Sequence, residues 1–304
     1  MDGQPESEQP PHRSGFCSVV GRPNAGKSTL INALVGSKIV ITSDKPQTTR
    51  HAVRGVLNRP DAQLVLVDTP GLHRPRTLLG QRLNDVVRST LSDVDVVAFC
   101  VPADQRVGPG DRYIAAEIGA LSKPLVAVVT KTDAVRSDQI AAQLIAVSKL
   151  ADFADIVPVS AVRGDQLDVL VDVLARHLPP GPSLYPAQMS TDADLDTQIA
   201  ELIREAALDG AREELPHSIA VTVEERNPRE GRSDLIDIFA TIHVERISQK
   251  PIVIGTGGAS LKRIGTIARA GIEELLGRRV NLDLHVAVES NWQRDPKKLD
   301  RLGF

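Results

Sequence analysis

The chain of 304 residues is 41% hydrophobic and 25% charged, which is ordinary for a globular protein and long enough for two domains with separate cores. Its formal net charge of −3 argues against a surface that binds nucleic acid everywhere, although a local basic patch is compatible with it. No N-terminal segment resembles a signal peptide, and no run approaches the ~18 apolar residues of a membrane span, so we expect a cytoplasmic protein.

Residues 1–14 are polar and rich in proline, which predicts a disordered leader. From residue 15 to 178, fully apolar runs alternate with amphipathic patterns, which predicts a mostly parallel sheet with helices on both faces. We expect strands at Phe16–Val20, Leu64–Val67, Val94–Val101, Leu125–Val129 and Ile156–Val159. We expect helices at Thr29–Val35, Leu78–Leu91, Asp111–Leu121, Gln139–Leu150 and Gln166–His177. A weaker run, His51–Leu57, is expected to form an antiparallel edge strand.

Residues 179–190 begin Pro-Pro-Gly-Pro, which is typical of a linker. Residues 191–304 then follow the order helix, two strands, two helices and strand, which predicts a smaller α+β domain. Its first helix is expected at Leu195–Glu214, its strands at Ile219–Val223, Leu235–Val244 and Val280–Val288, and its longest helix ends near Leu276.

Residues 21–28 read Gly-Arg-Pro-Asn-Ala-Gly-Lys-Ser and lie between a predicted strand and a predicted helix. They fit the pattern of a loop whose backbone N–H groups surround the phosphates of a nucleotide. In such a loop Lys27 supplies charge to the β- and γ-phosphates, and Ser28 can bind Mg²⁺. The sequence therefore predicts a phosphate site at the start of the first helix.

Three further motifs follow later strands and meet at the same sheet edge. Asp68-Thr-Pro-Gly71 can hold Mg²⁺ through Asp68 and sense the γ-phosphate through the Gly71 N–H. In Thr130-Lys-Thr-Asp133, the Asp133 carboxylate can accept two hydrogen bonds from guanine, whereas adenine lacks that donor pair. Ser160-Ala161 can offer backbone N–H groups to guanine O6. The expected nucleotide-contacting residues are Gly21, Arg22, Pro23, Asn24, Ala25, Gly26, Lys27, Ser28, Thr29, Asp68, Thr69, Pro70, Gly71, Leu72, Thr130, Lys131, Thr132, Asp133, Ser160 and Ala161.

A second loop, Gly255-Thr256-Gly257-Gly258, precedes an amphipathic helix in the second domain. In this context it is typical of the GXXG loop with which a KH domain clamps single-stranded nucleic acid, and Lys262 and Arg263 can pair with phosphates. Residues 246–304 carry a net charge of +5, whereas residues 190–245 carry a net charge of −9. The GXXG half of this domain is therefore the expected RNA-binding face.

Residues 47–51, Gln-Thr-Thr-Arg-His, look like a first switch segment, and with the motifs above they resemble the Era family of GTPases. The resemblance extends through a C-terminal tail, residues 291–304. It implies an α/β P-loop GTPase domain (15–178), followed by a smaller α+β type II KH domain (191–304). It also implies that Thr49, and less directly Thr48, joins Ser28 and Asp68 on Mg²⁺ when GTP is bound.

The function implied by the resemblance is slow GTP hydrolysis coupled to binding of the 3′ end of 16S rRNA, which assists maturation of the 30S ribosomal subunit. A monomer is expected, with peripheral contact to the inner face of the cell membrane. Two residues depart from the family pattern. Thr130 replaces the usual Asn, so nucleotide binding should be weaker with guanine preference kept; Thr256 replaces a common Lys, so RNA binding should be weaker and less salt-dependent.

Hydrolysis is expected to need a positive charge, because Leu72 stands where many GTPases place a water-orienting Gln. Asn24 matches the position that holds K⁺ in related GTPases, and Arg50 and Arg54 are alternative sources of charge. The expected catalytic residues are Asn24, Lys27, Thr49 and Gly71. Two other functions remain open: a switch whose second domain docks on a protein or membrane, and, less favoured, a small-molecule kinase, which would leave Thr130–Asp133 without a role.

Overall fold

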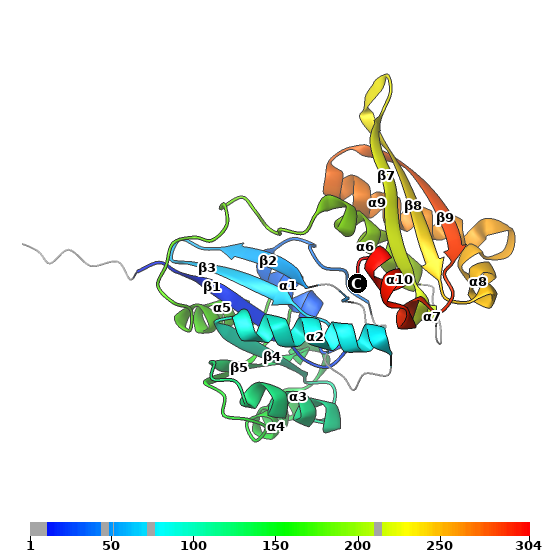
Figure 1. Ribbon diagram of the computed structural model, residues 1–304. Coiled ribbons are helices and arrows are strands. Elements are labelled where there is room, and N and C mark those ends of the chain that lie inside the picture. Colours follow the sequence, from blue (N-terminus) through cyan, green and yellow to red (C-terminus); the bar gives the residue numbers. More distant parts are fainter. Residues whose placement is uncertain (1–10, 44–48, 51, 72–76, 210–214) are drawn as a thin grey trace, which may run out of the picture.

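The computed structural model describes residues 11–43, 49–50, 52–71, 77–209 and 215–304. They form an α/β domain followed by a smaller α+β domain (Figure 1), so the predicted fold class is confirmed. The first sheet has six strands in the order β2-β3-β1-β4-β5-β6, all parallel except β2. Its strands are β1 (Arg13–Val20), β2 (Val53–Asn58), β3 (Ala62–Asp68), β4 (Val96–Pro102), β5 (Leu125–Thr130) and β6 (Asp155–Pro158).

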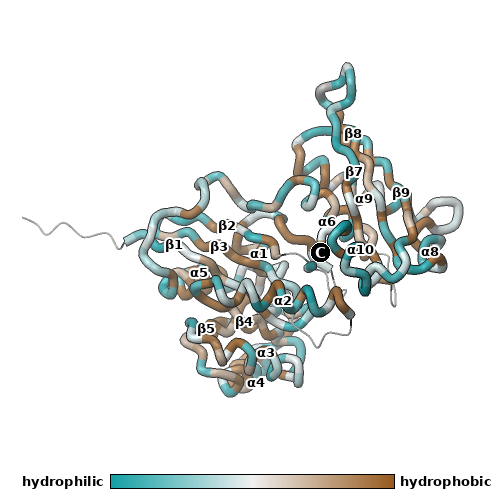
Figure 2. The backbone as a smooth tube through the Cα atoms, viewed as in Figure 1, coloured by the Kyte–Doolittle hydropathy of each residue, from teal (hydrophilic) through white to brown (hydrophobic). Residues whose placement is uncertain are grey.

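Five helices cover this sheet, and every residue of β3, β4 and β5 is buried between them. Figure 2 shows these strands as apolar segments inside a more polar outer layer. Both cysteines, Cys17 and Cys100, are free thiols in this core, and burial raises the pKa of each. The helices are α1 (Lys27–Val35), α2 (Leu78–Asp93), α3 (Pro109–Gly119), α4 (Ser137–Val147) and α5 (Leu167–Arg176).

The first strand begins three residues before the expected position, because Arg13 already pairs in register with Ala62. Its guanidinium also donates to the Leu178 carbonyl at 2.6 Å. Residues 13 and 14, assigned by the sequence to the leader, are therefore part of the sheet, while residues 1–10 lie outside the described residues.

The segment between the domains lies along the edge of the first sheet. The buried Gln63 amide accepts from the backbone N–H groups of Leu184 and Tyr185 at 2.6 and 2.9 Å. Farther along, the Val56 N–H donates to the Ser190 carbonyl at 2.9 Å. The proline-rich linker is thus held by specific hydrogen bonds, although its exact limits stay a prediction.

The second domain is a three-stranded sheet, β7-β8-β9, with an antiparallel and then a parallel pair. Helices α6 and α9 pack on it around a core of isoleucine, valine and alanine. Its strands are β7 (Ala220–Arg229), β8 (Arg232–Val244) and β9 (Arg279–Val288). Its helices are α6 (Leu195–Leu208), α7 (Leu215–Ser218), α8 (Lys250–Ile254), α9 (Ala259–Leu276) and α10 (Pro296–Arg301).

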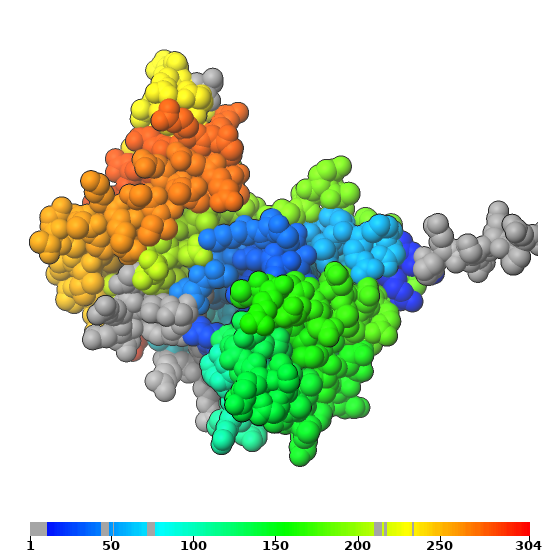
Figure 3. Space-filling view, turned by 180° about the vertical axis from the view of Figure 1, so that it is seen from behind, coloured from blue at the N-terminus to red at the C-terminus, as the bar shows by residue number. Residues whose placement is uncertain are grey.

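The two domains contact each other, and Figure 3 shows the second domain against the blue N-terminal part of the first domain. There the Glu205 carboxylate of α6 pairs with Lys38 at 2.6 Å and accepts from the Thr42 N–H at 3.0 Å. Within the part of the chain that the structure describes, no helix is both long and apolar enough to cross a membrane.

Candidate functional site

The phosphate loop joins β1 to α1 and is built around left-handed backbone. Asn24 and Gly26 have φ angles of 63° and 87°, and Gly26 caps the N-terminus of α1. Lys27 is only 6% exposed, and its Nζ donates to the carbonyls of Gly21 (3.2 Å) and Arg22 (3.3 Å). Burial lowers the pKa of Lys27, and Asp68 opposes that shift. The Lys27 ammonium therefore lies beside the N-terminus of α1, where the backbone N–H groups stabilise a bound anion.

Three oxygen-bearing side chains converge next to this loop from three separate segments. The Asp68 Oδ2 atom accepts from Thr49 Oγ1 at 2.8 Å and from Ser28 Oγ at 2.9 Å, and the two hydroxyls are 3.2 Å apart. Asp68 is fully buried, which raises its pKa, and its Oδ1 has no hydrogen-bond partner among the described residues. A buried carboxylate with an unsatisfied oxygen beside two hydroxyls is the donor set that Mg²⁺ prefers, so these residues fit that ion.

The segment after Asp68 lies directly against the phosphate loop. The Thr69 hydroxyl donates to the Val19 carbonyl of β1 at 3.0 Å. A Cβ placed on Gly71 would come within 3.0 Å of the Pro23 backbone nitrogen, so a larger residue at 71 would push the two segments apart. Leu72, the expected substitute for a catalytic Gln, lies outside the described residues.

The predicted base-binding residues come together at the ends of β5 and β6. The Ser160 hydroxyl donates to Asp133 Oδ1 at 2.7 Å and so orients the carboxylate expected to read guanine. Lys131 has a φ of 58°, and its Nζ lies 3.3 Å from Asp104 Oδ2. Thr132 donates its N–H to the Val159 carbonyl at 3.3 Å. The loop is thereby fixed to the adjacent strand.

Thr130 lies between the predicted base site and the phosphate loop. Its hydroxyl is buried and donates to the Ala25 carbonyl at 2.6 Å. Thr130 thus links the end of β5 to the phosphate loop. Because a hydroxyl has one proton to donate, none is left for the nucleotide base.

The two arginines considered as sources of catalytic charge are directed elsewhere. Arg54 forms an ion pair with Asp192 at 2.8 Å. Arg50 is buried against the second domain, where its Nη1 donates to the Ile219 carbonyl at 2.6 Å. Asn24 is exposed on the phosphate loop.

In the second domain, the GXXG loop connects α8 to α9 with three glycines in positive φ. A Cβ on Gly255 would lie 2.7 Å from the Ser260 nitrogen, whereas the exposed Gly257 has open space around it. Beside the loop is a groove of about 420 Å³ between α9 and β9. Its lining residues are Gly258, Leu261, Lys262, Gly265, Thr266, Arg269, Leu282 and Leu284.

Among the residues proposed to bind RNA, Lys262 lines this groove but Arg263 does not. The Arg263 guanidinium forms an ion pair with Asp209 at 2.8 Å. The sequence reasoning missed Arg269, which lies seven residues after Lys262 and hence on the same face of α9. It also missed the apolar floor made by Leu282 and Leu284. Helical spacing counted from Lys262 could have identified Arg269.

Comparison with known proteins places this geometry in a family. Residues 16–131 match the family described as 50S ribosome-binding GTPase, and residues 214–293 match the KH domain. GTPase Era of Mycobacterium avium (strain 104) is 62% identical over 295 residues, covering 96% of this chain and 99% of that protein. GTPase Era of Mycobacterium tuberculosis (strain ATCC 25177 / H37Ra) is 60% identical, with coverages of 96% and 98%. The chain belongs to the Era family of GTPases.

Solved structures of Era agree with this fold over both domains. A crystal structure of Era in complex with MgGDPNP and nucleotides 1506–1542 of 16S ribosomal RNA has a TM-score of 0.93 and 38% identity. It covers 96% of this chain and 99% of that one. A variant of Aquifex aeolicus Era bound to GDP·AlF4⁻ gives the same values. As an Era-family enzyme, the chain binds GTP and hydrolyses it to GDP and phosphate, as predicted.

The aromatic side chains of the tail pack against each other inside this Era-family chain. Trp292 is fully buried, its Nε1 donates to the Ser218 carbonyl at 3.2 Å, and its ring stacks on Phe304 at a centroid distance of 5.4 Å. The pair lies between the domains, near the position marked C in Figure 1. Trp292 therefore serves the junction of the two domains.

Proposed function

We propose that this GTPase uses its nucleotide state to control binding of the 3′ end of 16S rRNA and thereby assists assembly of the 30S ribosomal subunit. The observation that carries the proposal is the groove beside the GXXG loop, which combines an apolar floor with Lys262 and Arg269. Apolar surface suits unstacked bases, and cations suit the phosphates that connect them. The related Era complex, which contains an RNA of this kind, supports the same assignment.

In the proposed nucleotide complex, Lys27 binds the β- and γ-phosphates and Asp133 accepts from guanine. Ser28, Thr49 and Asp68 hold Mg²⁺, which neutralises charge on the phosphates. The Gly71 N–H lies at the γ-phosphate, where its close packing against Pro23 links the segment after Asp68 to the phosphate loop. These residues bind and orient GTP, and none of them is assigned as a general base.

The RNA interface can be tested by substituting two glycines that have nearly the same φ angle. Gly257 and Gly277 lie before and after α9, both have positive φ (58° and 61°), and neither has atoms within 4 Å of an added Cβ. Gly257→Asp places negative charge on the GXXG loop, whereas Gly277→Asp places the same charge and the same strain at the far end of the helix. Filter binding should use an RNA matching the 16S segment in the Era complex, in the presence of a non-hydrolysable GTP analogue.

We expect Gly257→Asp to weaken RNA binding by on the order of tenfold or more, because it repels phosphate. Gly277→Asp should stay close to wild type. Equal affinities for wild type and Gly257→Asp would contradict the RNA assignment and favour docking of the second domain on a protein or membrane.

We further propose that K⁺ binds at Asn24 and supplies positive charge next to the phosphates during hydrolysis. Exposure of Asn24 on the phosphate loop and the engagement of Arg50 and Arg54 elsewhere support this assignment. GTP turnover should then be faster in KCl than in NaCl of equal concentration, and Asn24→Ala should remove most of the difference. Equal turnover of the wild type in the two salts would rule out the K⁺ site.

Cytoplasmic location remains a prediction from the sequence, and a monomeric state and peripheral contact with the inner face of the membrane remain predictions from the family resemblance. Sedimentation with anionic phospholipid vesicles tests the membrane contact. Recovery of the protein in the supernatant at physiological salt would argue against it.

A further inference from the structure

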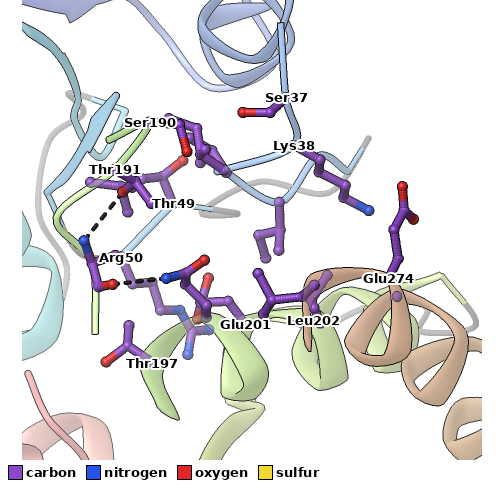
Figure 4. A pocket seen from close by; sticks show the side chains of 18 residues that line it. Ser37, Lys38, Thr49, Arg50, Ser190, Thr191, Thr197, Glu201, Leu202 and Glu274 are labelled. Carbon is purple, nitrogen blue, oxygen red and sulfur yellow. Dashed lines mark hydrogen bonds between the residues drawn. The ribbon is translucent and has the colours of Figure 1, made fainter. Parts of the chain in front are cut away.

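Two consecutive residues of the first switch segment point into different domains. Thr49 directs its hydroxyl to Ser28 and Asp68 in the nucleotide site. Arg50 is 2% exposed and donates from Nη1 to the Ile219 carbonyl, which precedes β7 in the second domain. Figure 4 shows Thr49 and Arg50 on the wall of a cavity of about 320 Å³ that they share with Glu201 and Leu202 of α6. Thr49, the candidate metal ligand, and Arg50, which contacts the second domain, are therefore consecutive residues.

The Arg50 guanidinium is held by the aromatic pair of the tail. Its Cζ atom lies 5.5 Å from the centroid of the Trp292 ring and 5.7 Å from that of Phe304. Aromatic faces attract a planar guanidinium, and the attraction is stronger where water is excluded. Burial nevertheless lowers the pKa of Arg50, Arg204 adds to the shift and Glu201 opposes it. A buried charge of this kind is retained only while its specific partners stay in place.

Helix α2 meets the same tail residues. Leu79 and Leu83 of α2, the helix that follows Asp68-Thr-Pro-Gly71, share one apolar cluster with Trp292. We call this the tail cluster; it consists of Leu79, Leu83, Ala220, Trp292, Leu299 and Leu302, with Leu78 and Phe304 packed against it. Arg82 of α2 also donates to the Phe304 carbonyl and to Asp300, both at 2.6 Å. The first switch segment, through Arg50, and helix α2 thus both contact the tail of the second domain.

We propose that Arg50 is a positioning residue through which the tail cluster holds Thr49 in the nucleotide site. If the tail moves, the guanidinium loses its aromatic and carbonyl partners and must leave its buried position. Since consecutive Cα atoms are about 3.8 Å apart, a backbone shift at Arg50 is transmitted to Thr49. The second domain thereby sets the rate of GTP hydrolysis from a distance. The inference rests on the proposed role of Thr49 as a ligand of Mg²⁺.

The test compares full-length variants in steady-state GTP hydrolysis over a range of Mg²⁺ concentrations. Arg50→Gln removes the charge, and Phe304→Ala removes one ring from the opposite side of the contact. Arg59→Gln is the matched control, because this arginine of the same domain forms its ion pairs with Asp61 and Asp172. GDP affinity and the urea midpoint verify that each variant is folded.

We expect Arg50→Gln and Phe304→Ala to lower kcat by on the order of tenfold and to raise the Mg²⁺ concentration needed for half the maximal rate. GDP affinity should stay within about twofold, because Thr49 is expected on the metal only with GTP. Arg50→Lys should recover only part of kcat, since an ammonium lacks the planar fork. Wild-type kcat and Mg²⁺ dependence in both Arg50→Gln and Phe304→Ala would overturn the inference. If Arg50→Gln fails to fold, kcat and the Mg²⁺ dependence of Phe304→Ala and Trp292→Phe test the inference instead.

A double variant separates this inference from the function it rests on. If Arg50 acts through Thr49, Thr49→Ala combined with Arg50→Gln should be no slower than Thr49→Ala alone. Additive losses would overturn the inference. A Thr49→Ala variant with normal rate and normal Mg²⁺ dependence would instead overturn the proposed metal role of Thr49. An impaired Thr49→Ala beside a normal Arg50→Gln would overturn the positioning role only.

Discussion

At residue scale, the single hydroxyl of Thr130 can donate to the phosphate loop or to the nucleotide base, but not to both. Its proton is donated to the Ala25 carbonyl at 2.6 Å, which links the end of β5 to the phosphate loop. An asparagine amide has two N–H donors and could keep that bond while donating a second to guanine N7. The present threonine therefore satisfies the phosphate loop and leaves no donor for the base, so we expect discrimination of guanine from adenine to rest on Asp133.

Thr130→Asn should consequently bind GDP about 2- to 10-fold more tightly, as one added hydrogen bond contributes about 0.5–1.5 kcal/mol. Thr130→Val, which keeps the shape and removes the hydroxyl, should bind more weakly than wild type because the Ala25 carbonyl loses its partner. Both affinities can be measured by isothermal titration calorimetry. A Thr130→Asn variant that binds GDP no more tightly than wild type would contradict this account.

At the scale of elements, the β-sheet of the second domain carries a histidine that should make its stability sensitive to acid. His243 of β8 contacts the Thr222 hydroxyl of β7 at 2.9 Å. Burial lowers the pKa of His243, Arg301 and His285 add to the shift, and Glu224 and Glu289 oppose it. Because the unfolded chain takes up this proton more readily than the folded one, stability falls as the pH drops below the ordinary histidine value of about 6.5.

His243→Gln should therefore lose less stability than wild type between pH 7.5 and pH 5.5. The measurement is the midpoint of urea unfolding, followed by circular dichroism, at several pH values. His285→Gln, on the neighbouring strand and exposed, should reduce the slope less than His243→Gln does, because it removes only one contribution to the shift. Identical slopes for wild type and His243→Gln would mean that other groups cause the acid sensitivity.

At the scale of the whole molecule, the nucleotide site and the RNA groove lie in different domains that are joined by the tail cluster and by ion pairs such as Lys38–Glu205. Coupling between two sites is a free-energy difference that acts in both directions. RNA that binds preferentially to one arrangement of the domains must favour the nucleotide that stabilises the same arrangement. The docked domains therefore provide a physical route for reciprocal control.

We expect RNA affinity to differ by at least about fivefold between GDP and a non-hydrolysable GTP analogue, the lower range for coupled sites. Filter binding at fixed salt measures both values, and fixed salt matters because phosphate contacts are screened. The Phe304→Ala variant should show a smaller difference. Equal affinities in the two nucleotide states of the wild type would mean that the sites are not coupled.

The sequence by itself determined the two domains, the phosphate loop at residues 21–28 and the three strand-end motifs that share its sheet edge. It could do so because these features are local: a loop between a buried strand and a helix presents its backbone to an anion wherever that pattern occurs. The GXXG loop could be identified for the same reason. Element boundaries were close but shifted, as with β1, whose start depends on Arg13 pairing with Ala62 in another strand.

Only the tertiary structure decided which partner each long side chain reaches. Arg50 was a candidate catalytic charge in the sequence, yet it lies against Trp292 and Phe304. Arg263 was expected to pair with RNA phosphates, and the structure places its guanidinium against Asp209. The physical reason is that partners separated by 50 to more than 200 residues are brought together by the packing of helices and domains, and no local pattern encodes that packing. Thr130 likewise found its acceptor on the phosphate loop because the fold places β5 beside it.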